Sequence, residues 1–152
     1  MAEQQEAIEF LADPNSYGAD VGDVERIDTH SAVVFLAGGY AYKIKRAVNL
    51  GFLDFSTLAL RRRYCNAEIR LNRRTAPSLY LRVASLTREA EGDLALDGDG
   101  EVVEYVVILR RFDQHYLLDR MAQRGELDAP LMRTLADRVA AFHAEAEPVP
   151  GA

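Results

Sequence analysis

A stretch of seven residues, Tyr40 to Arg46, constrains the fold more than any other part of this sequence. It follows a Gly38-Gly39 pair, which in turn follows the apolar run from Ala32 to Ala37. Two strand-like runs separated by two glycines predict a β-hairpin, because glycine adopts the positive φ angles that a two-residue turn requires. The sequence therefore predicts two antiparallel strands joined at Gly38-Gly39.

The expected turn also sets which residues share a face of the hairpin. In this pairing Leu36 lies opposite Ala41, and Val34 lies opposite Lys43. Because side chains alternate along a strand, all four lie on one face of the sheet. That face is apolar except for the lysine, so we expect the lysine to meet an anionic partner.

The remaining sequence favours an α+β fold, in which an antiparallel sheet with one inserted helix is followed by further helices. We expect the N-terminal helix and linker in residues 1–23, a sheet-containing lobe in 24–113 and a helical part in 114–152. Ser56 is the expected N-cap of the inserted helix. Strands are expected at 24–28, 32–37, 40–46, 80–88, 94–96 and 102–109, and helices at 3–12, 57–74, 116–123 and 131–145.

Composition narrows the function classes. The chain has 152 residues, 49% of them hydrophobic and 28% charged, which is ordinary for one globular domain. Its net charge of −6 argues against a general nucleic-acid binder. A single cysteine, Cys65, is compatible with a reducing compartment. The start of the chain does not resemble a signal peptide, and no apolar run is long enough to span a bilayer. We therefore expect a soluble cytoplasmic protein that does not contact a membrane.

The inserted helix carries a glutamate, Glu68, in the middle of its apolar arc. The residues three and four positions away on either side are not cationic, so no partner is available on the same helix. A carboxylate on a packed face must find a partner elsewhere or be neutralised. We expect that partner to be Lys43 or Lys45. The alternative is a partly exposed glutamate that is satisfied by water or by Arg61.

This order of a loop, a hairpin with a lysine, a helix with an inward glutamate and further strands resembles the small lobe of a protein-kinase-like fold. It is most similar to the aminoglycoside-phosphotransferase family, whose bacterial members often continue into a P-loop ATP-binding domain. The resemblance covers about residues 5 to 146 and is carried by three blocks, at residues 29–45, 51–58 and 68–81.

The resemblance implies a nucleotide-binding lobe with ATP as its cofactor. Lys43 would hold the α- and β-phosphates and Glu68 would orient it. The family's short phosphate loop would correspond to Thr29, His30 and Ser31, although no GxGxxG motif is present. The apolar ceiling over adenine would be formed by Val34, Leu36 and Ala41, and the hinge by Leu109, Arg110 and Arg111.

Other parts of the family pattern are not found. Phosphoryl transfer needs a base near the acceptor hydroxyl and carboxylates for Mg²⁺. None of the three histidines has an aspartate two residues later, and GxxxxGK[ST] does not occur. We therefore interpret the chain as an amino-terminal fragment with a truncated large lobe, inactive by itself and prone to self-association. Mg²⁺ would bind only with the missing lobe, and the small-molecule acceptor is unknown. The alternative is a non-catalytic interaction or regulatory module of the same fold.

The other candidate residues favour structural roles. His30 could contact phosphate or merely cap a strand, and the sequence leaves both open. Cys65 is expected in the core, and His143 near a helix C-terminus, where the dipole favours it. The arginines of residues 61–74 are expected to form a solvated face. The run Asp97-Gly98-Asp99-Gly100 is typical of a turn rather than of a metal site.

Overall fold

The computed structural model describes residues 2–19 and 21–147, and it divides the chain into two units, residues 1–111 and 112–152. The first unit is built on a six-stranded antiparallel sheet with the strand order β1-β2-β3-β6-β4-β5. Its strands are β1 (Val24–Asp28), β2 (Ala32–Ala37), β3 (Tyr40–Lys45), β4 (Tyr80–Arg88), β5 (Leu94–Leu96) and β6 (Glu101–Arg110). The predicted α+β class is confirmed at this level.

The hairpin between β2 and β3 has the predicted register. Leu36 pairs with Ala41 and Val34 with Lys43, and the turn closes at Gly38, whose φ of 53° lies in the left-handed region that favours glycine. β3 then pairs with β6, which also pairs with β4, so β6 is central as its apolar residues on both faces predict.

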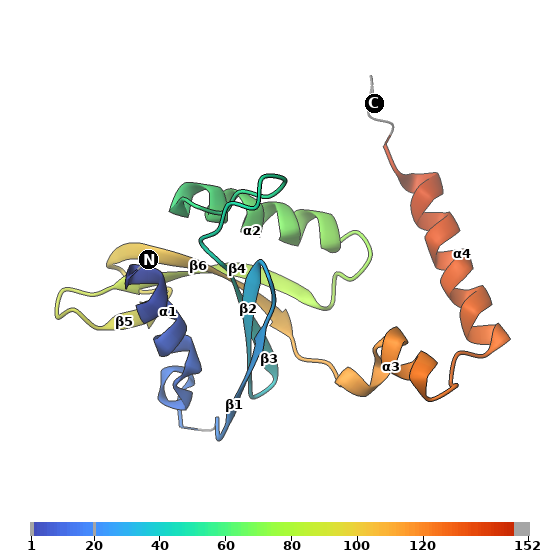
Figure 1. Ribbon diagram of the computed structural model, residues 1–152, viewed down its shortest axis with the longest axis horizontal. Helices are drawn as coiled ribbons and strands as arrows, with labels where there is room; N and C mark the ends of the chain where they lie inside the picture. The colour runs from blue at the N-terminus through green and yellow to red at the C-terminus, as the bar shows by residue number, and fades with distance from the viewer. Residues whose placement is uncertain (1, 20, 148–152) are drawn as a thin grey trace. The chain divides into compact units, whose positions relative to one another are not determined.

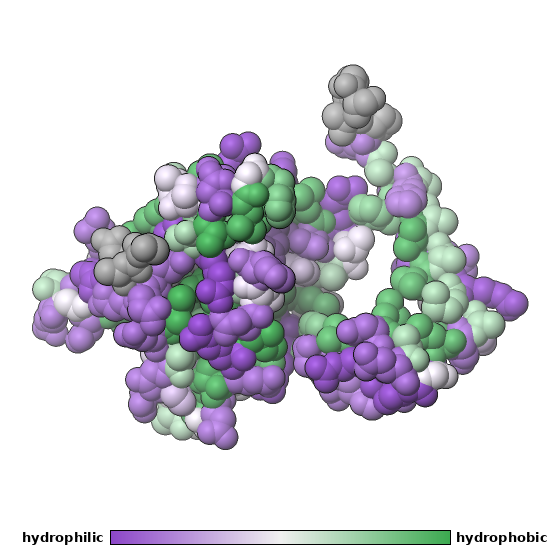
Figure 2. All heavy atoms as spheres, in the orientation of Figure 1, coloured by the Kyte–Doolittle hydropathy of each residue, from purple (hydrophilic) through white to green (hydrophobic). Residues whose placement is uncertain are grey.

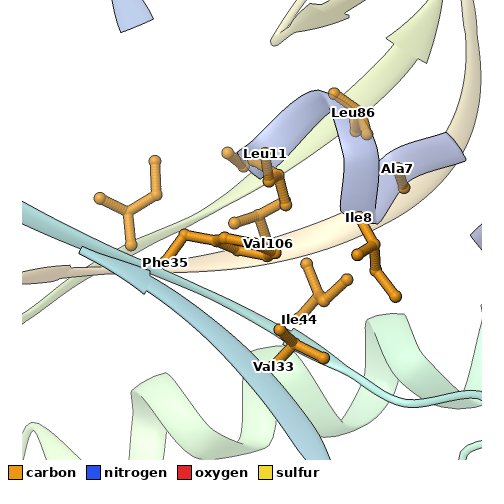
Figure 3. Close-up of a cluster of buried hydrophobic side chains, with 10 residues drawn as sticks. Ala7, Ile8, Leu11, Val33, Phe35, Ile44, Leu86 and Val106 are labelled. Carbon is orange, nitrogen blue, oxygen red and sulfur yellow. The ribbon is translucent and has the colours of Figure 1, made fainter. Parts of the chain in front are cut away.

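One face of the sheet packs against the helix α1 (Ala2–Ala12). Figure 3 shows Ala7, Ile8 and Leu11 of α1 directed toward Val33, Phe35, Ile44, Leu86 and Val106 of the strands. The buried stripe of α1 includes Ala7, whereas Ala12 at the end of the helix is exposed. The N-terminal helix therefore belongs to the same unit as the sheet, rather than to a separate segment 1–23.

The opposite face of the sheet packs against α2 (Leu58–Asn72), which is inserted between β3 and β4 (Figure 1). Cys65 and Ile69 of α2 lie against Val107 of β6. The N-cap is Thr57, whose hydroxyl accepts a hydrogen bond from the backbone N–H of Leu60, so the expectation of Ser56 was wrong by one residue. The sheet is thus a layer between two helices. Because side chains alternate along a strand, neighbouring residues of β6 point to opposite helices.

The second unit contains a short 3₁₀ turn (Gln114–Tyr116), α3 (Leu118–Gln123) and α4 (Ala129–Glu145). The expected helix at 116–123 is therefore shorter and begins after a turn capped by Asp113. In α4 the side chain of Asp128 caps the helix, and Pro130 lies in its first turn, where proline needs no hydrogen-bond donor. α4 has no buried residue within its described length, and Val139 is 44% exposed.

Hydrophilic residues cover most of the visible face over α1 and the sheet (Figure 2). Among the described residues, no helix is both long enough and apolar enough to cross a membrane.

Candidate functional site

The candidate site forms where α2 crosses the face of β3 that is opposite to α1. Alternation along β3 sends Ile44 into the α1 core and Lys43 and Lys45 to the α2 side. Glu68 lies near the C-terminal end of α2, one turn after the buried Cys65. The sheet and the helix therefore bring two ammonium groups to one carboxylate.

Glu68 binds the two lysines through different oxygens. Lys43 Nζ donates to Oε1 at 2.8 Å, and Lys45 Nζ donates to Oε2 at 2.6 Å. The side chains of Lys43, Lys45 and Glu68 are 29%, 8% and 11% exposed. The prediction that Glu68 meets Lys43 or Lys45 is confirmed, and the structure shows both contacts at once. We call these three residues the two-lysine clamp.

The surroundings of the clamp keep its carboxylate charged. Burial alone would raise the pKa of Glu68, but the hydrogen bonds from Lys43 and Lys45 outweigh it and hold that pKa below its usual range. Tyr80, at the start of β4, has a raised pKa because it is buried and because the Glu68 charge lies nearby. With one carboxylate between two ammonium groups, the clamp carries a formal charge of +1.

Lysine occurs at two positions in this sequence, and both are in the clamp. The chain has 18 basic residues, and all of them except Lys43 and Lys45 are arginines. Arginine prefers bidentate, planar contacts with carboxylates, whereas the lysine ammonium is a compact charge on a flexible stem. The restriction of lysine to these two positions is visible in the sequence and marks the site without any motif.

A second buried network lies beside the clamp and was missed from the sequence. Glu104 of β6 is fully buried and accepts two hydrogen bonds from Arg61 Nε at 2.8 and 2.9 Å. It also accepts from Gln4 Nε2 at 2.8 Å and from the backbone N–H of Tyr105 at 2.9 Å. Arg61 is buried too, so it is not part of a solvated arginine face and does not partner Glu68.

The Glu104 network fixes the connection between β3 and α2. Arg61 Nη1 donates to the carbonyl oxygens of Phe55 and Ser56 in this connection. On its other side, Gln4 of α1 donates to the carbonyl of Lys45 and accepts from the backbone N–H of Ala47. The helices on both faces of the sheet thus hold the end of β3 that carries the clamp.

The predicted phosphate loop, Thr29 to Ser31, joins β1 to β2 at the same end of the hairpin. The Thr29 hydroxyl donates to the carbonyl of Ala32 and accepts from its backbone N–H, which closes a tight turn. His30 is exposed, and Ser31 is half-buried. Ala32, the next residue, pairs with Lys45, so the loop lies one strand away from the clamp.

The residues of the predicted adenine ceiling, and Leu109 of the predicted hinge, also lie on the α2 face. Leu36, Ala41 and Leu109 follow one another across β2, β3 and β6, and Val34 lies beside Lys43. Leu36 and Ala41 are buried, whereas Val34 and Leu109 are half-buried.

The hinge residues after Leu109 are exposed, and both are engaged. Arg110 pairs with Tyr40 and donates its backbone N–H to the carbonyl of Leu79. Arg111 forms an ion pair at 3.7 Å with Glu25 of β1. This ion pair reaches across β2 and β3, the strands that carry Leu36 and Ala41.

Two cavities lie away from the clamp residues. One of about 280 Å³ is polar and is lined by Gln4, Ala47, Ser56, Leu58, Arg61, Arg88, Glu101, Val102 and Val103. An open one of about 610 Å³ follows the outer side of α2 and is lined by Leu58, Ala59, Arg62, Arg63, Asn66 and Tyr105. Neither is lined by a clamp residue.

Two further candidates have structural roles. Cys65 is fully buried, and burial raises its pKa to about 12, so its thiol is not activated. The Asp97 carboxylate accepts from the backbone N–H of Ser85 and pairs with Arg82, which fixes a turn. In the described part of the chain, no three His, Cys, Asp or Glu side chains are grouped as metal ligands.

Three curated proteins are similar to most of this chain: one from Mycobacterium bovis and two from Mycobacterium tuberculosis (strains CDC 1551 and H37Rv), all named as uncharacterized. Each is 36% identical over 120 residues, which is 79% of this chain and 22% of the relative. The chain therefore spans about a fifth of the length of these relatives. No protein-family model matches the chain, and no solved structure matches it significantly.

Proposed function

We propose that this chain is the ATP-binding part of a small-molecule phosphotransferase, with a fold like the small lobe of a protein kinase. The observation that carries the proposal is the clamp, in which Nζ of Lys43 on β3 lies 2.8 Å from Oε1 of Glu68 on α2. In kinase-like enzymes this pair holds the nucleotide phosphates. The strand order β1-β2-β3-β6-β4, with α2 inserted between β3 and β4, supports the same assignment.

The residues around Lys43 fit a polyphosphate. Lys43 is the more exposed of the two lysines, and the clamp has a positive formal charge to attract an anion. The turn from Thr29 to Ser31 lies at the same end of the hairpin and would contribute backbone N–H groups. The base would lie against Val34 and Leu109, the half-buried part of the apolar ceiling.

In this proposal, the other groups that phosphoryl transfer requires lie in other parts of a longer protein. The similarity to relatives of which this chain spans 22% supports that division. Within the proposal, those parts supply the Mg²⁺ ligands, the base and the acceptor site. The chain by itself binds nucleotide and does not transfer phosphate.

A non-catalytic module of the same fold is the second candidate. The burial of Leu36 and Ala41 favours it, because an adenine ceiling needs accessible apolar surface. Such a module would keep the clamp as a structural ion-pair cluster and would bind other proteins instead of nucleotide.

Titration of the purified chain with ATP separates the two candidates. We expect saturable binding that the Lys43→Met substitution weakens by about 10- to 100-fold, as expected for a charged hydrogen bond of about 1.5–3 kcal/mol. Arg70→Met removes an exposed cation from α2, the helix that carries Glu68, and is the matched control, which should bind ATP like the native chain. Absence of any Lys43-dependent signal at millimolar ATP would favour the non-catalytic module.

A further inference from the structure

The two lysines of the clamp occupy different environments. The Lys45 side chain is 8% exposed, and its ammonium lies between Glu68 Oε2 at 2.6 Å and the ring of Phe55, 4.8 Å from the centroid. The Lys43 side chain is 29% exposed, so it is the more accessible of the two lysines. An incoming anion can therefore approach Lys43 more readily than Lys45.

The clamp also differs from a simple ion pair in its net charge, which is formally +1 instead of zero. In a simple lysine–glutamate pair the charges cancel, so the pair has no net positive charge with which to attract a phosphate. Here Lys45 offsets the charge of Glu68, so the charge of Lys43 remains in excess. Cys65, one turn away on α2, and Tyr80 at the start of β4 are the neighbouring titratable groups, and burial raises the pKa of both. Both are neutral when protonated and anionic when ionised, so neither can compensate the negative charge of Glu68.

The use of lysine at these two positions points in the same direction. An arginine at position 45 would tend to bind both carboxylate oxygens in a bidentate fork, so Lys43 would have to share an oxygen with it. An ammonium binds one oxygen and leaves the other to its neighbour, as the separate contacts to Oε1 and Oε2 show.

We propose that Lys45 is a positioning residue that holds Glu68 in place and offsets its charge, so that Lys43 is available to bind a phosphate group. The identity of the anion rests on the proposed function. The division of roles between the lysines rests on their contacts and exposure alone.

The native chain allows a direct test, because selective ¹⁵N,¹³C-lysine labelling gives two side-chain signals, one for each lysine of the clamp. We expect ATP, and separately sodium tripolyphosphate, to shift the Lys43 signal and to leave the Lys45 signal nearly unchanged. A larger shift of the Lys45 signal would overturn the proposal. This measurement needs no substitution at the buried position.

Substitutions test the coupling between the lysines. In Lys45→Met, Lys43 is the remaining partner of Glu68, and we expect ATP to bind about tenfold more weakly although Lys43 is intact. Adding Glu68→Gln to Lys45→Met releases Lys43, and we expect affinity to return to within about twofold of native. Weak binding that Glu68→Gln does not relieve would show that Lys45 acts only through packing, and would overturn the proposal.

A third readout does not depend on ATP. Carboxyl ¹³C titration should show that Lys45→Met raises the pKa of Glu68, and raises it more than Lys43→Met does, because Lys45 makes the shorter contact and is the more deeply buried lysine. Equal effects of the two substitutions, or no effect of Lys45→Met, would contradict the assigned role. If neither ATP nor tripolyphosphate moves a lysine signal, the proposed function fails, whereas the order of these two pKa changes still decides whether Lys45 holds Glu68.

Discussion

Replacing Arg61 by methionine should destabilise the chain far more than any other arginine substitution on α2. The change removes both hydrogen bonds from Arg61 Nε to Glu104 and leaves a fully buried carboxylate with two neutral donors, Gln4 and the Tyr105 backbone. Breaking a buried ion pair by removing one partner costs about 3–5 kcal/mol. This loss is a large fraction of the free energy of unfolding of a typical domain, which is about 5–15 kcal/mol.

Urea unfolding followed by far-UV circular dichroism measures this loss. With a slope of about 2 kcal/mol per molar urea, the unfolding midpoint of Arg61→Met should fall by about 2 M. Arg63→Met, two residues along the same helix and exposed, is the matched control and should change the free energy of unfolding by less than about 0.5 kcal/mol.

A double substitution shows whether charge is the cause. Arg61→Met combined with Glu104→Gln removes the buried charge as well as its partner, and should recover more than half of the lost stability. A double variant no more stable than Arg61→Met, or a loss below about 1 kcal/mol in Arg61→Met itself, would refute the reasoning.

Three further predictions concern α2 and its cap. The stabilisation that Glu68 gains from its lowered pKa is present above about pH 4.5 and is lost as the pH falls through the lower pKa of the folded state, so Glu68→Gln should flatten the acid limb of a stability–pH profile. A limb as steep as the native one would contradict this. Cys65, with a pKa raised to about 12, should resist a thiol-directed disulfide reagent at pH 8 until urea unfolds the chain, and rapid native labelling would show that it is not buried. Thr57→Ala should cost about 1 kcal/mol of unfolding free energy through the lost cap, whereas Ser56→Ala should change little; equal losses would contradict the cap assignment.

The hairpin and the Glu68 contacts could be predicted because local rules determine them. Two glycines fix the turn, period-two alternation then fixes the register, and a glutamate without a cation three or four residues away must find its partner on another element. These rules do not choose between Lys43 and Lys45, because both side chains point to the same face. The structure resolves the choice by using one oxygen for each lysine.

The Arg61–Glu104 network could not be predicted in the same way. Arg61 belongs to a run of three arginines, and its neighbours Arg62 and Arg63 are exposed, so helical periodicity gives little reason to bury one of them. A glutamate within the valine-rich strand β6 was the available signal, but its partner depends on how α2 crosses the sheet. The position of Thr57 as N-cap also depends on the exact end of a loop, which side-chain patterns locate to within a residue or two.

The position of α1 has a consequence for how this chain is made. Gln4 and Glu104, joined by a hydrogen bond, are separated by 100 positions in the sequence. Helix α1 therefore cannot acquire all of its final neighbours until β6, the last strand of the sheet in chain order, has been synthesised. Long separations of this kind slow folding, because a large loop must close before its contacts form. Until β6 is present, Ile8 and Leu11 lack Val106 and Ile108 in the core that α1 completes.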